Sequence, residues 1–324
     1  MSSQQAIPDG VLDIGGSQTL SRLQNSIAKK LVSKDSLNRH FLPDVFFSDD
    51  EGLRLWHKLN CLPDYYQTRD EVELLEQWGS EIEHFIPQDC TIIDLGCGDV
   101  RKIKPILDKL ESTDKNITYF GLDLSLATVS ESVGRLRCTY QNIKCFGLWG
   151  TFDDGMEWAK TIAGPRLFLS LGSIFANDRF DRAVKYLTQW THILRPADLM
   201  LIGIDCLQDS DAVWKSYHDS DGLFEKFIRN GFAHANRVSA APWYRHEDWE
   251  IRGDLDLDPV AHRFILKAVR DVDSAAPGIR FKAGDEIECY EGYKQTPELV
   301  HRQLEESSLD EIKMWQSPSG SICK

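Results

Sequence analysis

The most constraining feature of the sequence is the stretch Thr91–Val100, which reads T-I-I-D-L-G-C-G-D-V. Its apolar run, with Ile92 and Ile93, predicts a buried parallel strand that leads directly into a turn with two glycines. Gly96 and Gly98 have no Cβ, so the backbone can turn tightly there and come close to a ligand. This pattern predicts a cofactor site in an α/β fold.

A second apolar strand is expected at Ile117–Leu124, I-T-Y-F-G-L-D-L, about two dozen residues further on. It carries an acid, Asp123, near its carboxyl end. In nucleotide-binding α/β folds an acid at this place accepts hydrogen bonds from the two ribose hydroxyls. The sequence therefore predicts that the cofactor contains a nucleoside.

Two cofactors fit a G-x-G turn, a dinucleotide and S-adenosylmethionine, and the third glycine distinguishes them. After Gly98 the chain reads D-V-R-K, so the G-x-G-x-x-G that brings a backbone close to a pyrophosphate is absent. The form D-x-G-x-G with a later acid is typical of class I methyltransferases, whose cofactor has no phosphate. We predict S-adenosylmethionine as the cofactor.

Composition excludes several classes of function. The chain has 324 residues, 42% of them hydrophobic, which suffices for a full core. Its net charge of -14 and pI near 5.1 argue against a nucleic-acid surface. No run approaches the roughly 20 apolar residues of a membrane span, and the first residues do not show a signal-peptide pattern. We expect a cytosolic monomer that acts on a small molecule.

Eight cysteines are scattered without a C-x-x-C pair or a histidine at metal-ligand spacing. We therefore expect neither a disulfide framework nor a metal site. Cys97 lies between the two glycines of the turn, where packing or a cofactor contact is favoured over a nucleophilic role.

The first third of the chain is expected to be helical. Met1–Gly16 is polar and shows no recognisable chemistry, whereas Ser17–Ser33 has apolar residues at helical spacing. Within Asp49–Gly79, one helix is predicted to stop before Pro63 and a second to be capped by Thr68. Further strands are predicted at Leu167–Leu171, Leu199–Ile204 and His262–Asp271, with late strands in the region of Ile279–Lys294. Helices are predicted at Arg179–Thr191 and Glu225–Phe232, and Asp211–Tyr217 leads to a D-x-x-G turn.

Four motifs in order resemble the histidine-specific methyltransferase family, enzymes that trimethylate the α-amine of histidine in ergothioneine biosynthesis. They are L-P-D-Y-Y-x-T-R-x-E from Leu62, I-D-L-G-C-G from Ile93, F-G-L-D-L-S from Phe120 and L-G-S-I-F-A-N from Leu171. The resemblance spans about Asp44 to Lys294. The run W-G-T-F-D-D-G-M-E-W, Trp149–Trp158, further resembles fungal relatives that N-methylate dimethylallyltryptophan.

The resemblance implies a set of residues that hold S-adenosylmethionine. Asp123 would accept the ribose hydroxyls, Lys102 would reach the methionine carboxylate, and the pair Thr151 and Phe152 would lie beside the adenine. The set is Gly96, Cys97, Gly98, Lys102, Asp123, Leu124, Thr151 and Phe152. The chain departs from the family at Thr151, where the family has an acid, and at Ser48, where it has a tyrosine.

The resemblance also implies the residues that hold the substrate. Asn177 would grip the backbone of an amino acid, because an amide can accept from the amine and donate to the carboxylate. Tyr65 and Tyr217 would donate phenol hydroxyls to the carboxylate, and these three residues form the expected catalytic set. The expected substrate-binding set is Tyr65, Tyr66, Asn177, Tyr217, Leu266, Tyr290 and Gly292. In the helix that follows Tyr217, Ile228 replaces a family asparagine.

The most consequential departure from the family lies in G-D-E-I-E-C-Y-E-G-Y-K, which ends at Lys294. The family's glutamate and serine that hold the imidazole of histidine are replaced by Tyr290 and Gly292. An aromatic ring beside a glycine offers apolar area and no charge partner, so it disfavours imidazole and favours a larger ring. We therefore expect tryptophan or a prenylated tryptophan as substrate.

Together these patterns predict a Rossmann-like class I methyltransferase with an inserted substrate-binding subdomain. We expect a helical segment at 1–85, the cofactor-binding core at 86–205, the insertion at 206–275 and late strands that complete the core at 276–324. The expected activity is α-N-methylation of an aromatic amino acid. Histidine N-methylation and a non-catalytic regulator with a methyltransferase fold are the alternatives, and no residue is compelling as a general base.

Overall fold

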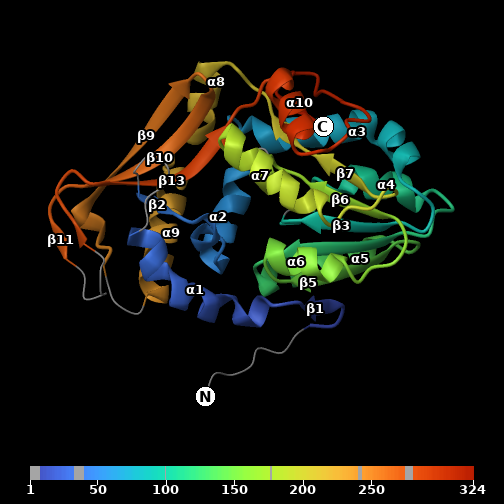
Figure 1. Ribbon diagram of the computed structural model, residues 1–324, viewed down its shortest axis with the longest axis horizontal. Coiled ribbons are helices and arrows are strands. Elements are labelled where there is room, and N and C mark those ends of the chain that lie inside the picture. The colour runs from blue at the N-terminus through green and yellow to red at the C-terminus, as the bar shows by residue number, and fades with distance from the viewer. Residues whose placement is uncertain (1–7, 33–39, 99, 176, 240–242, 274–279) are drawn as a thin grey trace. The chain divides into compact units, whose positions relative to one another are not determined.

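The computed structural model describes residues 8–32, 40–98, 100–175, 177–239, 243–273 and 280–324 (Figure 1). The chain forms two compact units. The first unit comprises Met1–Ser17, Tyr66–Gln208 and Lys294–Lys324, and the second unit comprises Gln18–Tyr65 and Asp209–Tyr293. Each unit is therefore assembled from segments that are distant in the sequence.

The first unit contains a sheet of six parallel strands in the order β1-β5-β4-β3-β6-β7. Its central strand β3 pairs with β4 on one side and with β6 on the other, so the strand order reverses at β3. In open α/β sheets, ligands bind beyond the carboxyl ends of the strands at such a reversal. The strands are β1 (Val11–Asp13), β3 (Thr91–Leu95), β4 (Thr118–Asp123), β5 (Lys144–Trp149), β6 (Arg166–Ser170) and β7 (Leu199–Ile202).

Both faces of this sheet are covered by helices, as alternate residues of the strands show. Ile92 of β3 packs in one core with side chains of α3, α4 and α5, whereas Ile93 packs in a second core with α6 and α7. Figure 1 shows α6 and α7 beside the strands that they cover. The helices are α3 (Tyr66–Phe85), α4 (Lys104–Glu111), α5 (Leu126–Thr139), α6 (Phe152–Ala159), α7 (Phe180–Thr191) and α10 (Pro297–Glu306). Two short strands, β8 (Ile204–Asp205) and β14 (Ile322–Cys323), pair antiparallel.

The second unit contains a mixed sheet of four strands in the order β2-β13-β10-β9 and a small ribbon of β11 and β12. The strands are β2 (His40–Leu42), β9 (Trp249–Leu257), β10 (Val260–Ala268), β11 (Val272–Asp273), β12 (Arg280–Phe281) and β13 (Glu286–Tyr293). Helices α2 and α9 pack against each other. The helical elements are α1 (Gly16–Val32), which starts in the first unit, η1 (Asp44–Phe47), α2 (Asp50–Leu59), α8 (Ser210–Tyr217), α9 (Leu223–Val238) and η2 (His246–Asp248).

Most predicted elements are confirmed, with three local corrections. Helix α3 begins at Tyr66, so Thr68 lies in its first turn and is not its cap. The predicted strand Leu199–Ile204 divides into β7 and β8, in two different sheets, at Gly203. The space for a Cβ at Gly203 is filled by the side chains of Glu71 and Lys324, which explains the glycine at the break. Strand β1 lies in the polar segment in which the sequence predicted no strand.

The predicted domain boundaries are wrong in one respect. The late strands at 276–324 were expected to complete the cofactor core, but β13 pairs with β10 and β2 in the sheet of the second unit. The predicted insertion at 206–275 is likewise joined by residues 18–65. Pairing between strands far apart in sequence decides these boundaries, and the local pattern of a strand does not reveal its partner.

A buried ion pair fixes the start of β6. Arg166 has no exposed side-chain surface, and its Nη2 lies 2.5 Å from Oδ2 of Asp198, whose side chain is 1% exposed. The guanidinium also donates to the carbonyls of Ala159 and Ile193, at 2.6 Å each. Every face of the charge is therefore satisfied by the surrounding elements.

We predict that Asp198→Asn lowers the free energy of unfolding by about 3 kcal/mol, because it leaves the buried Arg166 without its counter-charge. Urea denaturation with a fitted midpoint and slope measures the effect. The control is Asp181→Asn, whose carboxylate is 72% exposed and which should change stability by less than about 0.5 kcal/mol. Equal stability of the two variants would contradict the role given to the ion pair.

Candidate functional site

The glycine turn follows β3 as predicted. Gly96 has φ +73° and Gly98 has φ +32°, a left-handed backbone that favours glycine. A Cβ at Gly96 would lie 3.2 Å from Cδ1 of Ile174 and 3.5 Å from Cζ of Phe152. The backbone N–H of Gly96 donates to the carbonyl of Leu122 at 2.9 Å, which ties the turn to the neighbouring strand β4. The turn therefore has a fixed backbone that no side chain covers at Gly96 and Gly98.

Asp123, the last residue of β4, is directed to this turn. Its Oδ2 accepts from the backbone N–H of Gly98 at 3.2 Å, and its Oδ1 accepts from that of Ser125 at 3.1 Å. Burial raises the pKa of this carboxyl, and the backbone hydrogen bonds partly oppose the rise. The structure thus brings Gly96, Gly98 and Asp123 together, as the sequence predicted.

The first turn of α6 carries two further residues of the predicted cofactor set. The ring of Phe152 lies against Gly96, whereas Thr151 is the N-cap of α6. The hydroxyl of Thr151 donates to Oδ2 of Asp154 at 2.7 Å and accepts from the backbone N–H of Asp154 at 3.1 Å, which forms a capping box. The carbonyl of Leu124 accepts from the indole Nε1 of Trp149 at 3.0 Å. Thr151 therefore keeps the helix start in place, and its hydroxyl is engaged in doing so.

Cys97 faces the interior beneath the turn. Its Sγ would lie 2.9 Å from a Cβ at Gly121 of β4, so the thiol occupies the space that this glycine leaves. Burial raises the pKa of the thiol well above its usual value, and the nearby carboxylates of Asp123 and Asp94 raise it further. Cys97 is therefore a protonated packing residue and is unsuited to act as a nucleophile.

Lys102 belongs to a buried charge cluster that the sequence did not reveal. Its Nζ lies 3.2 Å from Oε2 of Glu71, and Oε1 of Glu71 accepts from Lys324 Nζ at 2.7 Å and from the backbone N–H of Gly172 at 2.8 Å. Burial opposes ionisation of Glu71, but the charges of Lys324 and Lys102 lower its pKa to about 2. The side chain of Lys102 is 16% exposed and that of Lys324 is not exposed, so Lys102 is the cation with access to a ligand.

Asp94 is a second carboxyl that the sequence analysis did not single out. It lies in β3 directly before the turn, is 2% exposed, and accepts a hydrogen bond from the hydroxyl of Tyr119 at 2.8 Å. Burial raises its pKa to about 7, although Tyr119, Lys102 and Lys324 act in the opposite direction. The acid of the D-x-G-x-G pattern therefore lies before the turn with a pKa that burial raises to about 7.

Asn177 lies in the loop between β6 and α7 and is partly exposed. Two consecutive residues of this loop, Gly172 and Ser173, have positive φ angles of +82° and +56°. The hydroxyl of Ser173 accepts from the backbone N–H of Asp205 at 3.0 Å, which fixes the loop to β8. A non-glycine residue in this conformation is a sign of a constrained loop.

Tyr66, expected in the substrate set, binds a buried carboxylate in the structure. Its hydroxyl lies 2.9 Å and 2.8 Å from the two carboxylate oxygens of Asp205, and Lys294 Nζ lies 2.7 Å from Oδ2 of the same residue. All three side chains are buried within the first unit. The hydroxyl of Tyr66 is therefore used to stabilise a buried ion pair, a partner that the local sequence around Tyr66 does not show.

The second unit contains a cluster of six aromatic side chains, here called the ring cluster. Its members come from η1, α2, α9 and β13 and from the residue before α3, and they are Phe47, Trp56, Tyr65, Phe224, Phe227 and Tyr290. The ring of Tyr290 lies with its centroid 5.3 Å from Phe227, 5.7 Å from Trp56, 6.0 Å from Phe47 and 6.3 Å from Phe224. Tyr65 lies 5.7 Å from Trp56. These are ordinary separations for packed aromatic rings.

Tyr290 has an unusual backbone. Its φ is +51°, and the register between β10 and β13 shifts where Arg263 pairs with Glu291 and Phe264 pairs with Cys289, so Tyr290 is the extra residue of a β-bulge. Burial raises the pKa of its phenol well above the usual value, and the phenols of Tyr65 and Tyr217 raise it further. The bulge thus directs the ring of Tyr290 into the cluster, beside two other phenols.

Tyr217, at the end of α8, stacks on a buried histidine that the sequence did not indicate. The ring centroids of Tyr217 and His262 are 4.4 Å apart with planes 14° from parallel. Nε2 of His262 lies 3.0 Å from Nε2 of His218, on which Trp214 stacks at 3.7 Å. Burial lowers the pKa of His218. This pair supports Tyr217 from one side, and its spacing of 44 residues gives no local pattern that could have predicted it.

Gly292 and Leu266 complete the predicted substrate set. Gly292 is buried and pairs with His262 across β10 and β13. Leu266 is fully buried and lies on the same face of β10 as Phe264, two residues earlier. The structure therefore gathers Tyr65, Tyr217, Tyr290, Gly292 and Leu266 in the second unit, and the cofactor set in the first.

The described part of the chain shows neither a membrane-spanning helix nor a metal site. Among the helices that the structure describes, none is long and apolar enough to cross a membrane. Within the same ranges, no group of three or more His, Cys, Asp or Glu side chains is placed to hold a metal ion.

The parallel sheet, the glycine turn at its central strand and the acid at the end of the next strand define a Rossmann-like fold of the class I methyltransferases. A sequence model described as "Histidine-specific methyltransferase, SAM-dependent" matches residues 23–324. The chain belongs to this family. The predicted fold class, the family resemblance and S-adenosylmethionine as cofactor are confirmed.

Individual relatives differ in what their names say. The chain is 30% identical over 315 residues to "Ergothioneine biosynthesis protein 1" of Neurospora crassa. The matched region covers 96% of this chain and 36% of that protein. It is 26% identical over 336 residues to "N-methyltransferase imqF" of Aspergillus flavus, with 100% and 89% covered. It is 29% identical over 223 residues to "4-dimethylallyltryptophan N-methyltransferase easF" of Claviceps purpurea, with 66% and 63% covered. The chain thus spans about a third of the length of the Neurospora relative.

We predict that Asp123→Ala weakens S-adenosylmethionine binding by about tenfold to a hundredfold, because two charge-assisted hydrogen bonds to the ribose are lost. Asp123→Asn, which keeps one acceptor oxygen, should give a smaller loss. Titration calorimetry on variants whose melting curves match the wild type measures the affinity. Unchanged affinity in a folded Asp123→Ala variant would contradict the assignment.

We predict that Asp94→Asn changes how stability depends on pH. The pKa of Asp94 is about 7 in the folded chain, against an ordinary value of 3.8. Between these limits the folded chain binds more protons than the unfolded chain, so the contribution of Asp94 to stability falls as pH rises from about 4 to 7. The stability of the asparagine variant relative to the wild type should therefore increase by about 3 kcal/mol between pH 4.5 and pH 8.

Urea denaturation at several pH values between 4.5 and 8 measures this difference. Exposed Asp114, changed to Asn, serves as the control and should give a curve parallel to the wild type. A constant difference between Asp94→Asn and the wild type would show that Asp94 does not titrate in this range.

Proposed function

We propose that this protein is an S-adenosylmethionine-dependent N-methyltransferase that acts on the α-amino group of an aromatic amino acid, tryptophan or a prenylated tryptophan. Membership of a methyltransferase family supports the reaction class. The name of the Claviceps relative, which specifies dimethylallyltryptophan, supports the substrate class. Histidine is the alternative substrate, which the family description favours.

The ring cluster around Tyr290 is the observation that carries the substrate class. A carboxylate and a hydroxyl can satisfy both nitrogens of an imidazole, whereas Tyr290 presents an aromatic ring and Gly292 has no side chain. The flanking rings of Trp56 and Phe227 add apolar surface. An imidazole among these rings would lose hydrogen bonds to water without regaining them, while an indole would gain buried apolar area. The cluster thus favours the larger and less polar ring.

The residues of the first unit fit the cofactor. A Cβ at Gly96 would meet Ile174 and Phe152, so the turn is kept free of side chains, and Asp123 is held there by the N–H of Gly98. We assign the ribose to Asp123, the methionine carboxylate to Lys102 and the adenine to Phe152, with Gly96, Cys97, Gly98, Leu124 and Thr151 around them. When bound, S-adenosylmethionine supplies an electrophilic methyl group on a sulfonium.

The task of this chain in the reaction is to hold and orient an amine. We assign the α-carboxylate of the substrate to the hydroxyls of Tyr65 and Tyr217 and its backbone to Asn177. Transfer requires the amine to be neutral, with its lone pair directed at the methyl carbon, so that a nitrogen–carbon bond forms as the sulfur–carbon bond breaks. Fixing the amino acid at its carboxylate supplies this orientation, and orientation is a large part of the acceleration in such transfers. The amine then releases a proton.

The direct test is incubation of the protein with labelled S-adenosylmethionine and each of the twenty amino acids, together with dimethylallyltryptophan. We expect label in tryptophan or its prenylated form. Transfer only to histidine would overturn the substrate class and leave the reaction class standing. Cofactor binding without transfer to any substrate would favour a non-catalytic regulator.

We predict that Tyr290→Glu combined with Gly292→Ser lowers activity on tryptophan and raises activity on histidine. The imidazole regains its two partners, whereas the indole meets a charge that has lost its water. The measurement is the tryptophan-to-histidine ratio of kcat/KM, with a melting curve for each variant. The expected change in the ratio is about tenfold or more, the worth of one satisfied polar contact.

Tyr290→Phe is the matched control because it keeps the ring and removes only the hydroxyl. It should retain the preference for tryptophan. A folded double variant with an unmoved ratio would show that these positions do not contact the substrate ring.

A further inference from the structure

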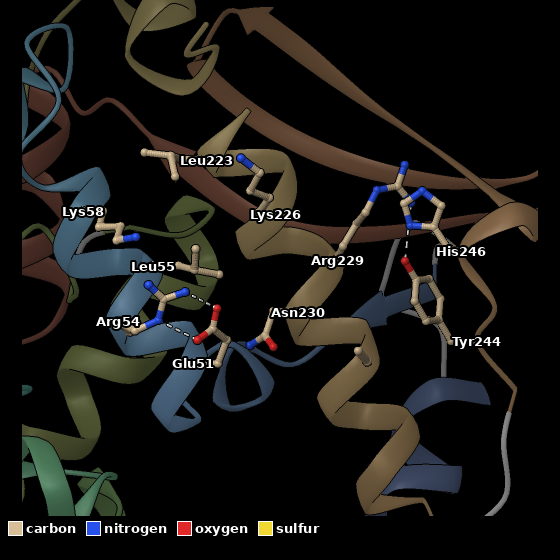
Figure 2. Close-up of a pocket in the computed structure, with 11 residues that line it drawn as sticks. Glu51, Arg54, Leu55, Lys58, Leu223, Lys226, Arg229, Asn230, Tyr244 and His246 are labelled. Carbon is tan, nitrogen blue, oxygen red and sulfur yellow. Dashed lines mark hydrogen bonds and ion pairs between the residues drawn. The ribbon is translucent and has the colours of Figure 1, made fainter. Parts of the chain in front are cut away.

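A cavity of about 650 Å³ lies between helices α2 and α9 of the second unit (Figure 2). Its lining comes from one stripe of each helix and from the segment around η2. The lining residues are Glu51, Arg54, Leu55, Lys58, Leu223, Lys226, Arg229, Asn230, Ala233, Tyr244 and His246. This volume lies in the range of small-molecule sites in proteins.

The cavity is basic in a chain that is strongly acidic. Four cationic side chains line it, from Arg54, Lys58, Lys226 and Arg229, whereas the carboxylates that pair with them are Glu51 in the lining and Glu225, which binds Arg229. The whole chain carries a net charge of -14. Like charges that line one cavity repel each other, and a bound anion would reduce the repulsion. The local excess of positive charge therefore has a physical cost that a bound anion would remove.

The two arginines are already oriented. Nε and Nη2 of Arg54 donate to the two oxygens of Glu51 at 2.7 Å and 2.5 Å, which leaves Nη1 for another acceptor (Figure 2). Nε of Arg229 donates to Glu225 at 2.8 Å, and its Nη1 lies 3.5 Å from the hydroxyl of Tyr244. A guanidinium fixed in this way loses little freedom when it binds carboxylate or phosphate oxygens.

Within the described ranges, neither lysine forms a close ion pair with a carboxylate. Lys226 Nζ donates to the backbone carbonyl of Asp221 at 2.9 Å. Considering the described residues alone, no carboxylate oxygen lies within 4.0 Å of the Nζ of Lys58 or Lys226. Lys58 comes from α2 and Lys226 from α9, so the pair can hold an anion from two sides.

This cavity is separate from the ring cluster on the same helices. Trp56 of α2 and Phe227 of α9 belong to the ring cluster, with ring centroids 5.4 Å apart and planes tilted by 35°. The cavity uses other positions of both helices, spaced three or four residues apart, such as Leu55 and Lys58 or Lys226 and Asn230. The cationic groups are therefore not part of the aromatic substrate set.

We propose that this cavity binds a small organic polyanion through Lys58, Lys226 and the free edges of the two guanidinium groups. The amide of Asn230 adds a hydrogen-bonding group, and the side chains of Leu55, Leu223 and Ala233 provide apolar surface for the body of the ligand. Phosphate and carboxylate groups share the chemistry that these residues recognise. The site takes a molecule with at least two such groups and discriminates against neutral molecules of equal size.

The test uses calorimetric titration of the intact chain with two probes, pyrophosphate and citrate, at low salt. S-adenosylhomocysteine is kept saturating so that the cofactor site is occupied. We expect at least one probe to bind with a Kd of about 1 mM or tighter. Its affinity should fall as salt is added. The probe that binds more tightly identifies phosphate or carboxylate as the preferred group.

Lys58→Gln combined with Lys226→Gln should weaken binding at least tenfold. The control is Arg280→Gln combined with Lys282→Gln, which removes the same charge from exposed positions of the second unit outside the cavity. The control should bind like the wild type. Equal weakening in both pairs would show a general effect of net charge and overturn the site.

A second measurement covers the case in which the lysine variant is unstable. Acetylation of lysines in the wild type, followed by mass spectrometry, should show that the bound probe protects Lys58 and Lys226 and leaves Lys282 reactive. Absence of binding by both probes, or reactivity of Lys58 and Lys226 that the probe does not change, would refute the proposal.

Discussion

The cofactor-binding unit depends on one buried carboxylate, that of Glu71. It accepts from the N–H of Gly172 in the loop after β6, lies against Gly203 at the break between β7 and β8, and is neutralised by Lys324 and Lys102. A carboxylate without water is stable only if such partners are complete. Of these two cations, Lys324 is fully buried and Lys102 is partly exposed. If Lys102 binds a ligand carboxylate, Glu71 therefore keeps Lys324 as its counter-charge. The same residue thus joins α3, two loops and the cation assigned to the cofactor.

The glycine turn differs from Glu71 because it has no side chains at its two glycines and presents a fixed backbone. Gly96 and Gly98 are held by hydrogen bonds to Leu122 and Asp123 of the neighbouring strand. Asp94 lies immediately beneath them with a pKa raised by burial, and Cys97 fills the space above Gly121. The turn is therefore supported by buried groups that are close to neutral, so the ionised Asp123 remains the main negative charge that a ribose would meet.

The sequence predicted the parts of this protein that are local and missed the parts that depend on distant pairing. The strand, the two glycines and Asp123 follow one another within about thirty residues, and their spacing has a direct physical meaning. By contrast, Tyr66 and Lys294 both bind Asp205, and His262 lies against His218, across sequence gaps that no periodicity marks. The prediction that the late strands complete the cofactor core failed for β13 for the same reason, since the pattern of a strand does not reveal its partner strand.

The position of Tyr290 suits a residue that determines which substrate ring is accepted and does not take part in methyl transfer. As the extra residue of a bulge it belongs to neither ladder pair, so its side chain can change with little effect on the pairing of β10 and β13. The rings of Trp56 and Phe227 that flank it belong to the second unit, whereas Gly96, Lys102 and Asp123 belong to the first. Residues without shared partners contribute independently to a good approximation. A substitution at the bulge should therefore alter which ring is accepted and leave cofactor binding unchanged.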